Sequence, residues 1–558
     1  MIKQITPIVV SIFAAGVTFG GQFKVAKELR GADPASTVDV IVQFNHVPTL
    51  RDHERILSHG GAWKGDPESG KFGAYAIPAR SLSRLENDPA VIHVSADHKV
   101  HAMLDLTADA VNASAAWASG WTGAGIGVAV IDSGISKHPD LDKRVVYSQD
   151  FSGGGMDDYY GHGEHVAGII GASGKTSECN TCTRLLRGMA PGVNLLDLRV
   201  LDQNGEGNDS GVIAAIAKAI ELKTRYNVRV INLSLGRPIS ESYTQDPLCQ
   251  EVEAAWRAGI VVVVAAGNGG RDNSQETDGY ATITAPGNDP YVITVGAMKT
   301  MGTPTRSDDL IASYSSKGPT LIDHIVKPDI VAPGNRVVSL LAPPSKFSQT
   351  YPANIVAFSY YRNTRQNTAS KQFFTLSGTS MATPVVSGAV ADLLQSDPNL
   401  TPDQVKAKLM LTAYKTFPAT SSVVDPATGT IYSSQYDIFT VGAGYLDVQA
   451  LLNDQNVPEG TALSPTAVYD ADSNNVYLVT DQQAVWGTKG VWGTQAVWGT
   501  KGVWGTQAVW GTKGVWGTQA VWGTSTMAGF RAVWGKQAVS GMSAKDGSEA
   551  DPITISGE

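Results

Sequence analysis

Short apolar runs rich in valine and isoleucine recur through the middle of the chain, with room for a helix after most of them. They cover residues 126–132, 193–201, 228–236, 260–268 and 291–298. Helical patterns lie between them, at 209–226 and 249–259. Strands that are apolar on both faces and alternate with helices predict an α/β fold, with a mostly parallel sheet and helices on both faces.

The preceding region, residues 37–103, has the pattern of a small α+β unit. Alternation predicts a strand over residues 37–44, and a helical pattern that ends in glycine follows at 49–61. A second strand, a second helix and a third strand are predicted at 70–79, 80–89 and 90–100.

Downstream, residues 374–395 are predicted to be a loop entering a buried helix, and residues 399–413 a helix with proline at its start. Residues 442–453 are the last predicted core element. The predicted organisation is an export signal with spacer, the α+β unit, one large α/β domain, a linker, a repeat region and a polar tail. These cover residues 1–36, 37–103, 104–453, 454–483, 484–541 and 542–558.

In the repeat region, tryptophan recurs every six residues from Trp486, and the phase continues to Ser540. This period gives no single helical face, and the glycine in every unit opposes a helix. In an extended chain, an even period keeps every tryptophan on one side. Two interpretations stay open, an ordered β-type repeat or a disordered low-complexity tail. Exposed tryptophans can stack on sugar rings, so a cell-wall or polysaccharide surface is a candidate partner.

The net charge and the N-terminal sequence reduce the number of possible functions. The net charge of −9 argues against nucleic acid as a partner. Lys3 precedes an apolar run from Ile5 to Phe19, which is short for a membrane span and suits the core of an export signal. A buried N-terminal strand is the alternative. Export predicts a secreted, extracellular protein, and the repeats add surface association as a further hypothesis.

The three cysteines are Cys179, Cys182 and Cys249. They are too few for a four-thiolate zinc site, and no histidine pair lies nearby at ligand spacing. In an exported protein the simpler prediction is a local disulfide between Cys179 and Cys182 that fixes a loop, with Cys249 left as a free thiol.

Four residues have the types and settings that nucleophilic catalysis needs. Asp132 ends an apolar strand, His162 lies between glycines where a helical pattern starts, and Ser380 stands at the entrance of a helix. A serine hydroxyl needs an imidazole to accept its proton and a carboxylate to orient that imidazole. Asn268 follows another strand, so its amide can donate to an oxyanion. Taken singly, each is also a common turn former or helix cap.

With these residues in place, the sequence resembles the subtilisin-like serine proteases. The matching stretches are "VAVIDSGISKHPDL", "GHGEHVAGII", "INLSLG", "VVAAGN", "KPDIVAPG" and "LSGTSMATPVVSG". They span residues 125–453, and the chain order of aspartate, histidine and serine is that of subtilisin. The resemblance implies four roles: orienting acid for Asp132, general base for His162, nucleophile for Ser380 and oxyanion donor for Asn268.

The resemblance also implies two walls of a substrate cleft, Ser234, Leu235 and Gly236 on one side and Ala266 and Gly267 on the other. Glycines there let a substrate strand approach and pair through main-chain hydrogen bonds. Neither wall carries a charge, so an apolar or broad preference before the scissile bond is expected.

Residues 37–103 resemble the inhibitory prodomain of the same family, most clearly in "ENDPAVIHVSADHKVHAM". The resemblance implies that this unit guides folding, is cut off by the enzyme itself and then blocks the cleft as an intramolecular inhibitor. It places the cut after Met103 or Leu104.

Two residues near His162 raise questions of their own. His165 is an alternative candidate for the general base, but the resemblance to the family implies a structural role for it. Glu164 stands where the family usually has threonine. A Glu164 carboxylate facing the site would raise the pKa of His162, whereas one pointing to solvent, the expected case, would have no effect.

Two further segments depart from the family pattern. Asp140 matches a position that often contributes to structural calcium, but the loop at 171–188 is longer than usual and carries two cysteines. Calcium binding is therefore without support. The polar and aromatic segment 342–374 resembles an insertion, and we expect it to line the cleft.

Together these features predict a secreted serine endopeptidase, made as a self-processing zymogen, that hydrolyses proteins or peptides through an acyl-enzyme and needs no cofactor for its chemistry. The alternative is a surface-binding or adhesion protein that uses the tryptophan repeats, with a secondary or inactive protease domain. Inactive relatives usually lose a triad residue, and none is missing here.

Overall fold

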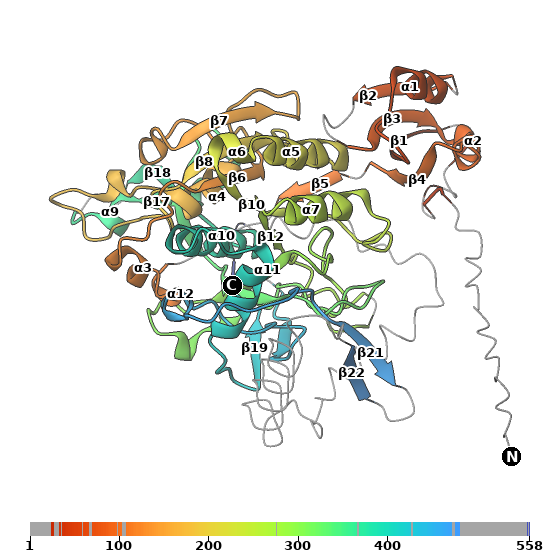
Figure 1. Ribbon diagram of the computed structural model, residues 1–558. Coiled ribbons are helices and arrows are strands. Elements are labelled where there is room, and N and C mark those ends of the chain that lie inside the picture. Colours follow the sequence, from red (N-terminus) through yellow and green to blue (C-terminus); the bar gives the residue numbers. More distant parts are fainter. Residues whose placement is uncertain are drawn as a thin grey trace, which may run out of the picture.

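The structure is a computed structural model (Figure 1). It describes residues 24–26, 29, 33–34, 36–58, 60–65, 70–97, 99–102, 108–274, 276–364, 368–425, 428–470, 475–479, 555 and 557–558. The predictions for the export signal, for the processing site at Met103 and Leu104 and for the repeat region fall outside these residues. Within the ranges given, no helix has both the length and the apolar character required to span a bilayer.

The centre of the molecule is an eight-stranded sheet in the order β14-β13-β12-β10-β6-β8-β7, with β15 paired to β13. Only β14 runs antiparallel to its neighbour. Every residue of β6 and β12 is buried, as expected for strands covered on both faces. The strands are β6 (Gly127–Asp132), β7 (Val145–Asp150), β8 (Asn194–Arg199), β10 (Val228–Leu233), β12 (Val261–Ala265), β13 (Ile293–Lys299), β14 (Leu310–Ile311) and β15 (Ile330–Pro333).

Helices pack on both faces of this sheet (Figure 1). On one face, α5 (Asp209–Glu221) packs against α7 (Pro247–Arg257). On the other, α10 (Thr379–Ser396) packs against α4 (Gly163–Gly171) and against β10, β12 and β13. The remaining helices of this domain are α3 (Ser114–Ala118), α6 (Lys223–Tyr226), α8 (Lys346–Thr350), α9 (Phe358–Tyr361), α11 (Pro402–Thr412) and α12 (Val448–Asn453). The predicted mostly parallel sheet with helices on both faces is confirmed.

A separate four-stranded antiparallel sheet, β2-β3-β1-β4, precedes this domain and has its own apolar core. It contains β1 (Thr37–Phe44), β2 (Ala62–Gly65), β3 (Phe72–Pro78) and β4 (Val91–Ala96), with helices α1 (Leu50–Leu57) and α2 (Leu82–Glu86). The short β2 was not predicted because "AWKG" offers too few residues to show alternation. Residues before 37 join this unit as well, since Val25 and Leu29 are buried in its core.

This N-terminal unit lies over α5 and α7 (Figure 1). Asp97 accepts hydrogen bonds from the backbone N–H of Ser210 at 3.1 Å and from its hydroxyl at 2.9 Å, at the first turn of α5. His93 Nε2 lies 2.5 Å from an oxygen of Glu241, and both side chains are buried. The chain then continues into β5 (Lys99–Ala102), which pairs with β9 (Glu206–Asn208) and β11 (Leu235–Gly236).

Two smaller sheets complete the domain. The first consists of β16 (Val337–Leu340), β18 (Ala369–Leu376) and β17 (Ile355–Ala357), and the second of β19 (Thr420–Val424) and β20 (Ile431–Gln435). The prediction that the core ends near residue 453 is wrong. Ala462 and Ala467 are buried in the main core, and the expected linker forms a hairpin, β21 (Thr466–Asp470) with β22 (Asn475–Val479). The expected linker is polar and contains proline, so its sequence gave no sign that these small apolar residues are buried.

Candidate active site

Two of the predicted catalytic side chains meet at the carboxyl end of β6. Asp132 is the last residue of that strand, and His162 immediately precedes α4. His162 Nδ1 lies 2.5 Å from Asp132 Oδ1, and both side chains are almost completely buried. Because the carboxylate accepts the hydrogen on Nδ1, Nε2 is the ring nitrogen that can take up a further proton.

Close packing of the chain brings α4 to this strand end. A Cβ atom on Gly163 would lie 2.2 Å from the carbonyl oxygen of Gly134, so only glycine fits there. Ser133 Oγ accepts a hydrogen bond from the Gly163 N–H at 2.9 Å and donates one to Asp158 at 2.9 Å. Asp158 in turn accepts from the backbone N–H of Glu164 at 2.8 Å. These contacts fix the start of α4, and with it His162, beside Asp132.

Ser380 lies in the first turn of α10, and Asn268 lies in the loop after β12. Asn268 Oδ1 accepts hydrogen bonds from the backbone N–H of Thr379 at 2.9 Å and from its hydroxyl at 3.1 Å. Since a backbone N–H can only donate, the orientation of the Asn268 amide is fixed. Asn268 Nδ2 and Ser380 Oγ are buried and have no hydrogen-bond partner among the described residues. Such atoms are uncommon in proteins, and here both are available to a bound molecule.

The structure thus brings Asp132 and His162 into contact, and it packs the helix of Ser380 against the helix that follows His162. Ser380 Oγ makes no hydrogen bond to His162. Catalytic hydrogen bonds are often long without substrate and shorten only in its complex.

The first predicted cleft wall is in contact with a strand. In the β11–β5 pair, Leu235 lies opposite Ala102 and Gly236 lies opposite His101, in antiparallel register. Ser234, at the start of this wall, donates its hydroxyl hydrogen to the carbonyl oxygen of Ser380 at 2.6 Å. The wall that pairs with the β5 backbone is therefore bonded directly to the first turn of α10, which carries the predicted nucleophile.

The second predicted wall, Ala266 and Gly267, is held by neighbouring loops. The Ala266 carbonyl accepts from the Thr284 N–H at 3.1 Å, and the Gly267 carbonyl accepts from the Ser316 N–H at 2.9 Å. Gly267 N–H donates to Thr379 Oγ1 at 3.1 Å. The same threonine therefore orients Asn268 and anchors this wall.

His165 and Glu164 each contact a segment other than the strand of Asp132. His165 Nε2 contacts the carbonyl oxygen of Phe374 at 3.1 Å, and burial lowers the pKa of His165 to about 3. The expectation that Glu164 points to solvent is wrong, because its side chain is fully buried. Its carboxyl accepts the N–H of Ser136 at 2.7 Å, and burial, with the nearby charge of Asp158, raises the pKa of Glu164 well above its usual value.

Asp140, at the candidate calcium position, is paired with Thr176. Both oxygens of Asp140 accept hydrogen bonds from Thr176, one from its backbone N–H at 2.7 Å and one from its hydroxyl at 2.6 Å. Among the described residues, no group of three or more acidic, histidine or cysteine side chains could hold a metal ion. Each oxygen of Asp140 thus already accepts a hydrogen bond.

The two segments that depart from the family pattern pack against each other. Cys179 and Cys182 form the predicted disulfide, and Cys249 is free and buried. The disulfide loop bonds to the insertion-like segment, because Asn363 N–H donates to the carbonyl oxygen of Thr181 at 2.7 Å. The same segment reaches the site where the ring of Phe347 lies 4.3 Å from that of Tyr160, two residues before His162.

Sequence reasoning missed several residues that support this site. Asp158 resembles Asp157 in the sequence, yet Asp158 is buried under the histidine helix and Asp157 is exposed. Thr379 stands inside the quoted motif "LSGTS", so its place beside Ser380 was a usable signal. Arg237 follows the first wall, and its buried ion pairs with Asp209 and Asp246 join it to two helices that no local pattern connects with the wall.

The chain is similar to known proteins over most of this domain. The family model described as "Subtilase family" matches residues 123–444. Serine protease AprX of Bacillus subtilis (strain 168) is 37% identical over 349 residues, which are 60% of this chain and 72% of that protein. Subtilisin E of the same organism is 35% identical over 347 residues, 61% of this chain and 74% of that protein. The extracellular serine proteinase of Thermus sp. (strain Rt41A) is 34% identical over 358 residues, 60% of this chain and 69% of that protein.

Proposed function

This chain belongs to the subtilase family of serine proteases, and we propose that Asp132, His162, Ser380 and Asn268 form its catalytic machinery. The observation that carries the proposal is the pairing of His162 Nδ1 with Asp132 at 2.5 Å. Ser380 Oγ and Asn268 Nδ2 support it, since they have no hydrogen-bond partner among the described residues and are the two atoms that would meet the scissile carbonyl.

In this mechanism Ser380 Oγ attacks the carbonyl carbon of the scissile peptide bond, while His162 Nε2 takes up the hydroxyl proton. The carbonyl oxygen becomes an oxyanion, which Asn268 Nδ2 and the N-terminal backbone of α10 stabilise through hydrogen bonds. His162 then gives its proton to the leaving amine, and the acyl-enzyme remains. Water hydrolyses the ester in the reverse sequence of proton transfers, and Ser380 is regenerated.

We propose that the N-terminal unit is an inhibitory prodomain that the enzyme removes from itself. The support is the backbone of β5, which runs antiparallel between β11 and β9 as an added strand. Extended peptides bind in this way, with main-chain hydrogen bonds for affinity. β5 ends at Ala102, directly before the expected processing site in the sequence.

Specificity and export complete the proposal. The cleft walls at residues 234–236 and 266–267 carry no charged side chain, which favours an apolar or broad preference before the scissile bond. The disulfide between Cys179 and Cys182 favours an oxidising compartment, in agreement with the apolar N-terminal run. We therefore propose a secreted, self-processing serine endopeptidase.

The test is replacement of Ser380 by alanine in the full chain. We expect loss of both prodomain removal and casein hydrolysis, whereas Ser119→Ala, an exposed serine, should retain both. N-terminal sequencing of the mature protein should find a start at or directly after Leu104. A wild-type protein that hydrolyses no protein substrate even after the prodomain is removed would contradict the proposal.

A further inference from the structure

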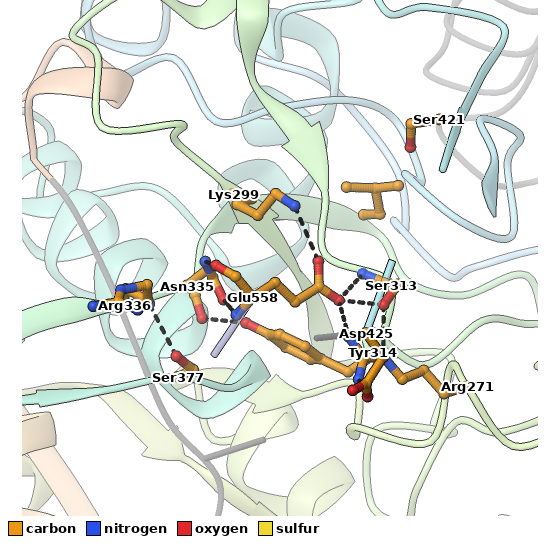
Figure 2. Close-up of polar contacts among 12 residues, drawn as sticks. Arg271, Lys299, Ser313, Tyr314, Asn335, Arg336, Ser377, Ser421, Asp425 and Glu558 are labelled. Carbon is orange, nitrogen blue, oxygen red and sulfur yellow. Dashed lines mark hydrogen bonds and ion pairs between the residues drawn. The ribbon is translucent and has the colours of Figure 1, made fainter. Parts of the chain in front are cut away.

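The last residues of the sequence return to the catalytic domain. The terminal segment is residues 555–558, of which the structure describes Ile555, Gly557 and Glu558. Figure 2 shows the Glu558 side chain among residues that follow or end strands of the main sheet. Its docking site consists of four residues: Arg271, Lys299, Ser313 and Asn335.

The docking site fully pairs the Glu558 carboxylate. One oxygen accepts from Arg271 Nη2 at 2.7 Å, from the Ser313 N–H at 2.9 Å and from the Ser313 hydroxyl. The other accepts from Lys299 Nζ at 3.2 Å. The Glu558 side chain is 0% exposed, so two cations and two neutral donors compensate a buried negative charge. A site of this kind selects a carboxylate.

The main chain of the terminal segment is recognised too. Asn335 accepts from the Glu558 N–H at 3.0 Å and donates to the Glu558 carbonyl oxygen at 3.1 Å. Asn354 donates to the Ile555 carbonyl oxygen at 2.5 Å. Gly557 has a φ of +63°, and a Cβ there would lie 2.4 Å from Ser377 Oγ. Recognition therefore requires glycine followed by an acidic residue.

The docking site borders the loop that carries Asn268. Arg271 lies three residues after Asn268, and its Nε donates to Ser313 Oγ at 2.7 Å. The N–H of Gly270, between them, donates to the Tyr314 carbonyl at 2.8 Å. Glu558 bonds to Arg271 and Ser313 at once, so it joins the loop of Asn268 to the segment beside it.

We propose that the terminal segment is an intramolecular ligand of this docking site and that its binding positions the loop that carries Asn268. The positioning step rests on the proposed function, whereas the binding step does not. Without Glu558, Arg271 keeps the carboxylate of Asp425 at 3.2 Å, and Lys299 has no ion-pair partner among the described residues. The loop then loses the anchor that this carboxylate provides.

A binding experiment tests the ligand directly. The full chain with Ser380→Ala and without residues 555–558 is titrated with the labelled peptide ISGE, and ISGQ serves as the matched control. We expect saturable binding of ISGE and binding of ISGQ that is weaker by about tenfold or more, because a charge-assisted buried contact is lost. Equal affinity of the two peptides, or no binding of ISGE, would overturn the proposal.

An activity experiment tests the positioning. Coupling between linked sites of about 0.5–2 kcal/mol corresponds to a change in rate of about 2- to 30-fold. We expect Glu558→Gln to lower kcat within that range with little change in KM, and Glu459→Gln, an exposed acid, to leave both unchanged. Added ISGE should restore kcat of the truncated active enzyme, whereas ISGQ should not.

The outcomes separate the two proposals. If wild type is active and Glu558→Gln matches it in kcat, the positioning role is refuted. If wild type is inactive while ISGE still binds, the assigned catalytic roles fail and the docking site stands. A KM change alone would place the effect of the terminal segment on substrate binding and would also refute the positioning of Asn268.

Discussion

Arg237 joins the first cleft wall to the two helices beneath it. It follows Gly236 directly and exchanges two main-chain hydrogen bonds with Ala285, at 3.0 and 2.8 Å. Its guanidinium lies 2.9 Å from Asp209 in α5 and 2.7 Å from Asp246 at the start of α7. All three side chains are buried. One cation therefore compensates two desolvated carboxylates.

Replacing Arg237 with methionine would remove the buried cation that Asp209 and Asp246 share. Breaking a buried ion pair by removing one partner costs about 3–5 kcal/mol, because the remaining charge stays desolvated. With two carboxylates left here, we expect a loss of unfolding free energy in the upper half of that range. Adding Asp209→Asn and Asp246→Asn removes the two carboxylate charges, so most of the lost unfolding free energy should be recovered. Asparagine in place of Asp246 can still cap α7.

Denaturant unfolding measures this loss, with Ser380→Ala in every variant to prevent autolysis. The matched control is Arg51→Met, which removes an exposed arginine and should cost about 1 kcal/mol or less. The reasoning is refuted if Arg237→Met costs no more than Arg51→Met. It is also refuted if the triple variant is as unstable as the single one.

Three further predictions concern the site and the disulfide loop. Asn268→Ala should lower kcat by about 10²–10³ with little change in KM, a magnitude carried over from subtilisin itself; a rise in KM alone would contradict the assigned role. Burial raises the pKa of Glu164 above 4.5, so the folded state favours the protonated form and stability is lost as the pH rises past that value. Glu164→Gln should therefore gain thermal stability over wild type as the pH is raised, and a pH-independent difference would refute this. Replacing Cys179 and Cys182 by serine should cost about 2 kcal/mol at most, and an unchanged melting temperature would show that the loop holds without the bond.

The sequence was sufficient to predict the parallel sheet and to predict that the four proposed catalytic residues lie at strand ends and helix starts. Long apolar strands signal burial by composition alone, and each candidate side chain follows a strand or begins a helix. Glu164 was mispredicted because an acid in the first turn of a helix is usually exposed, where it complements the helix dipole. Its burial depends on the Ser136 loop above it, which no local pattern indicates.

Contacts between distant segments were the main feature that the sequence did not predict. The hairpin at residues 466–479 packs through single small residues, too few to form a periodic pattern. Glu558 and Arg271 are separated by 287 residues, and an acidic residue in a polar tail is ordinarily solvated. Only the folded chain, which brings Lys299 and Ser313 to the same place, gives Glu558 a partner.

Several contacts between distant segments restrain the orientation of the Asn268 side-chain amide. Thr379, next to the proposed nucleophile Ser380, donates to Asn268 Oδ1, and the Ser316 hydroxyl accepts from the N–H of the next residue, Gly269, at 3.0 Å. An oxyanion donor is effective only if it is already aimed before charge develops, since reorientation during the reaction would consume the stabilisation it provides. A loop restrained at its start by Thr379 and at its end through Arg271 meets that requirement. Loss of the contact between Arg271 and Glu558 should therefore lower kcat, because the Asn268 amide is less well oriented. The affinity for substrate should stay largely unchanged.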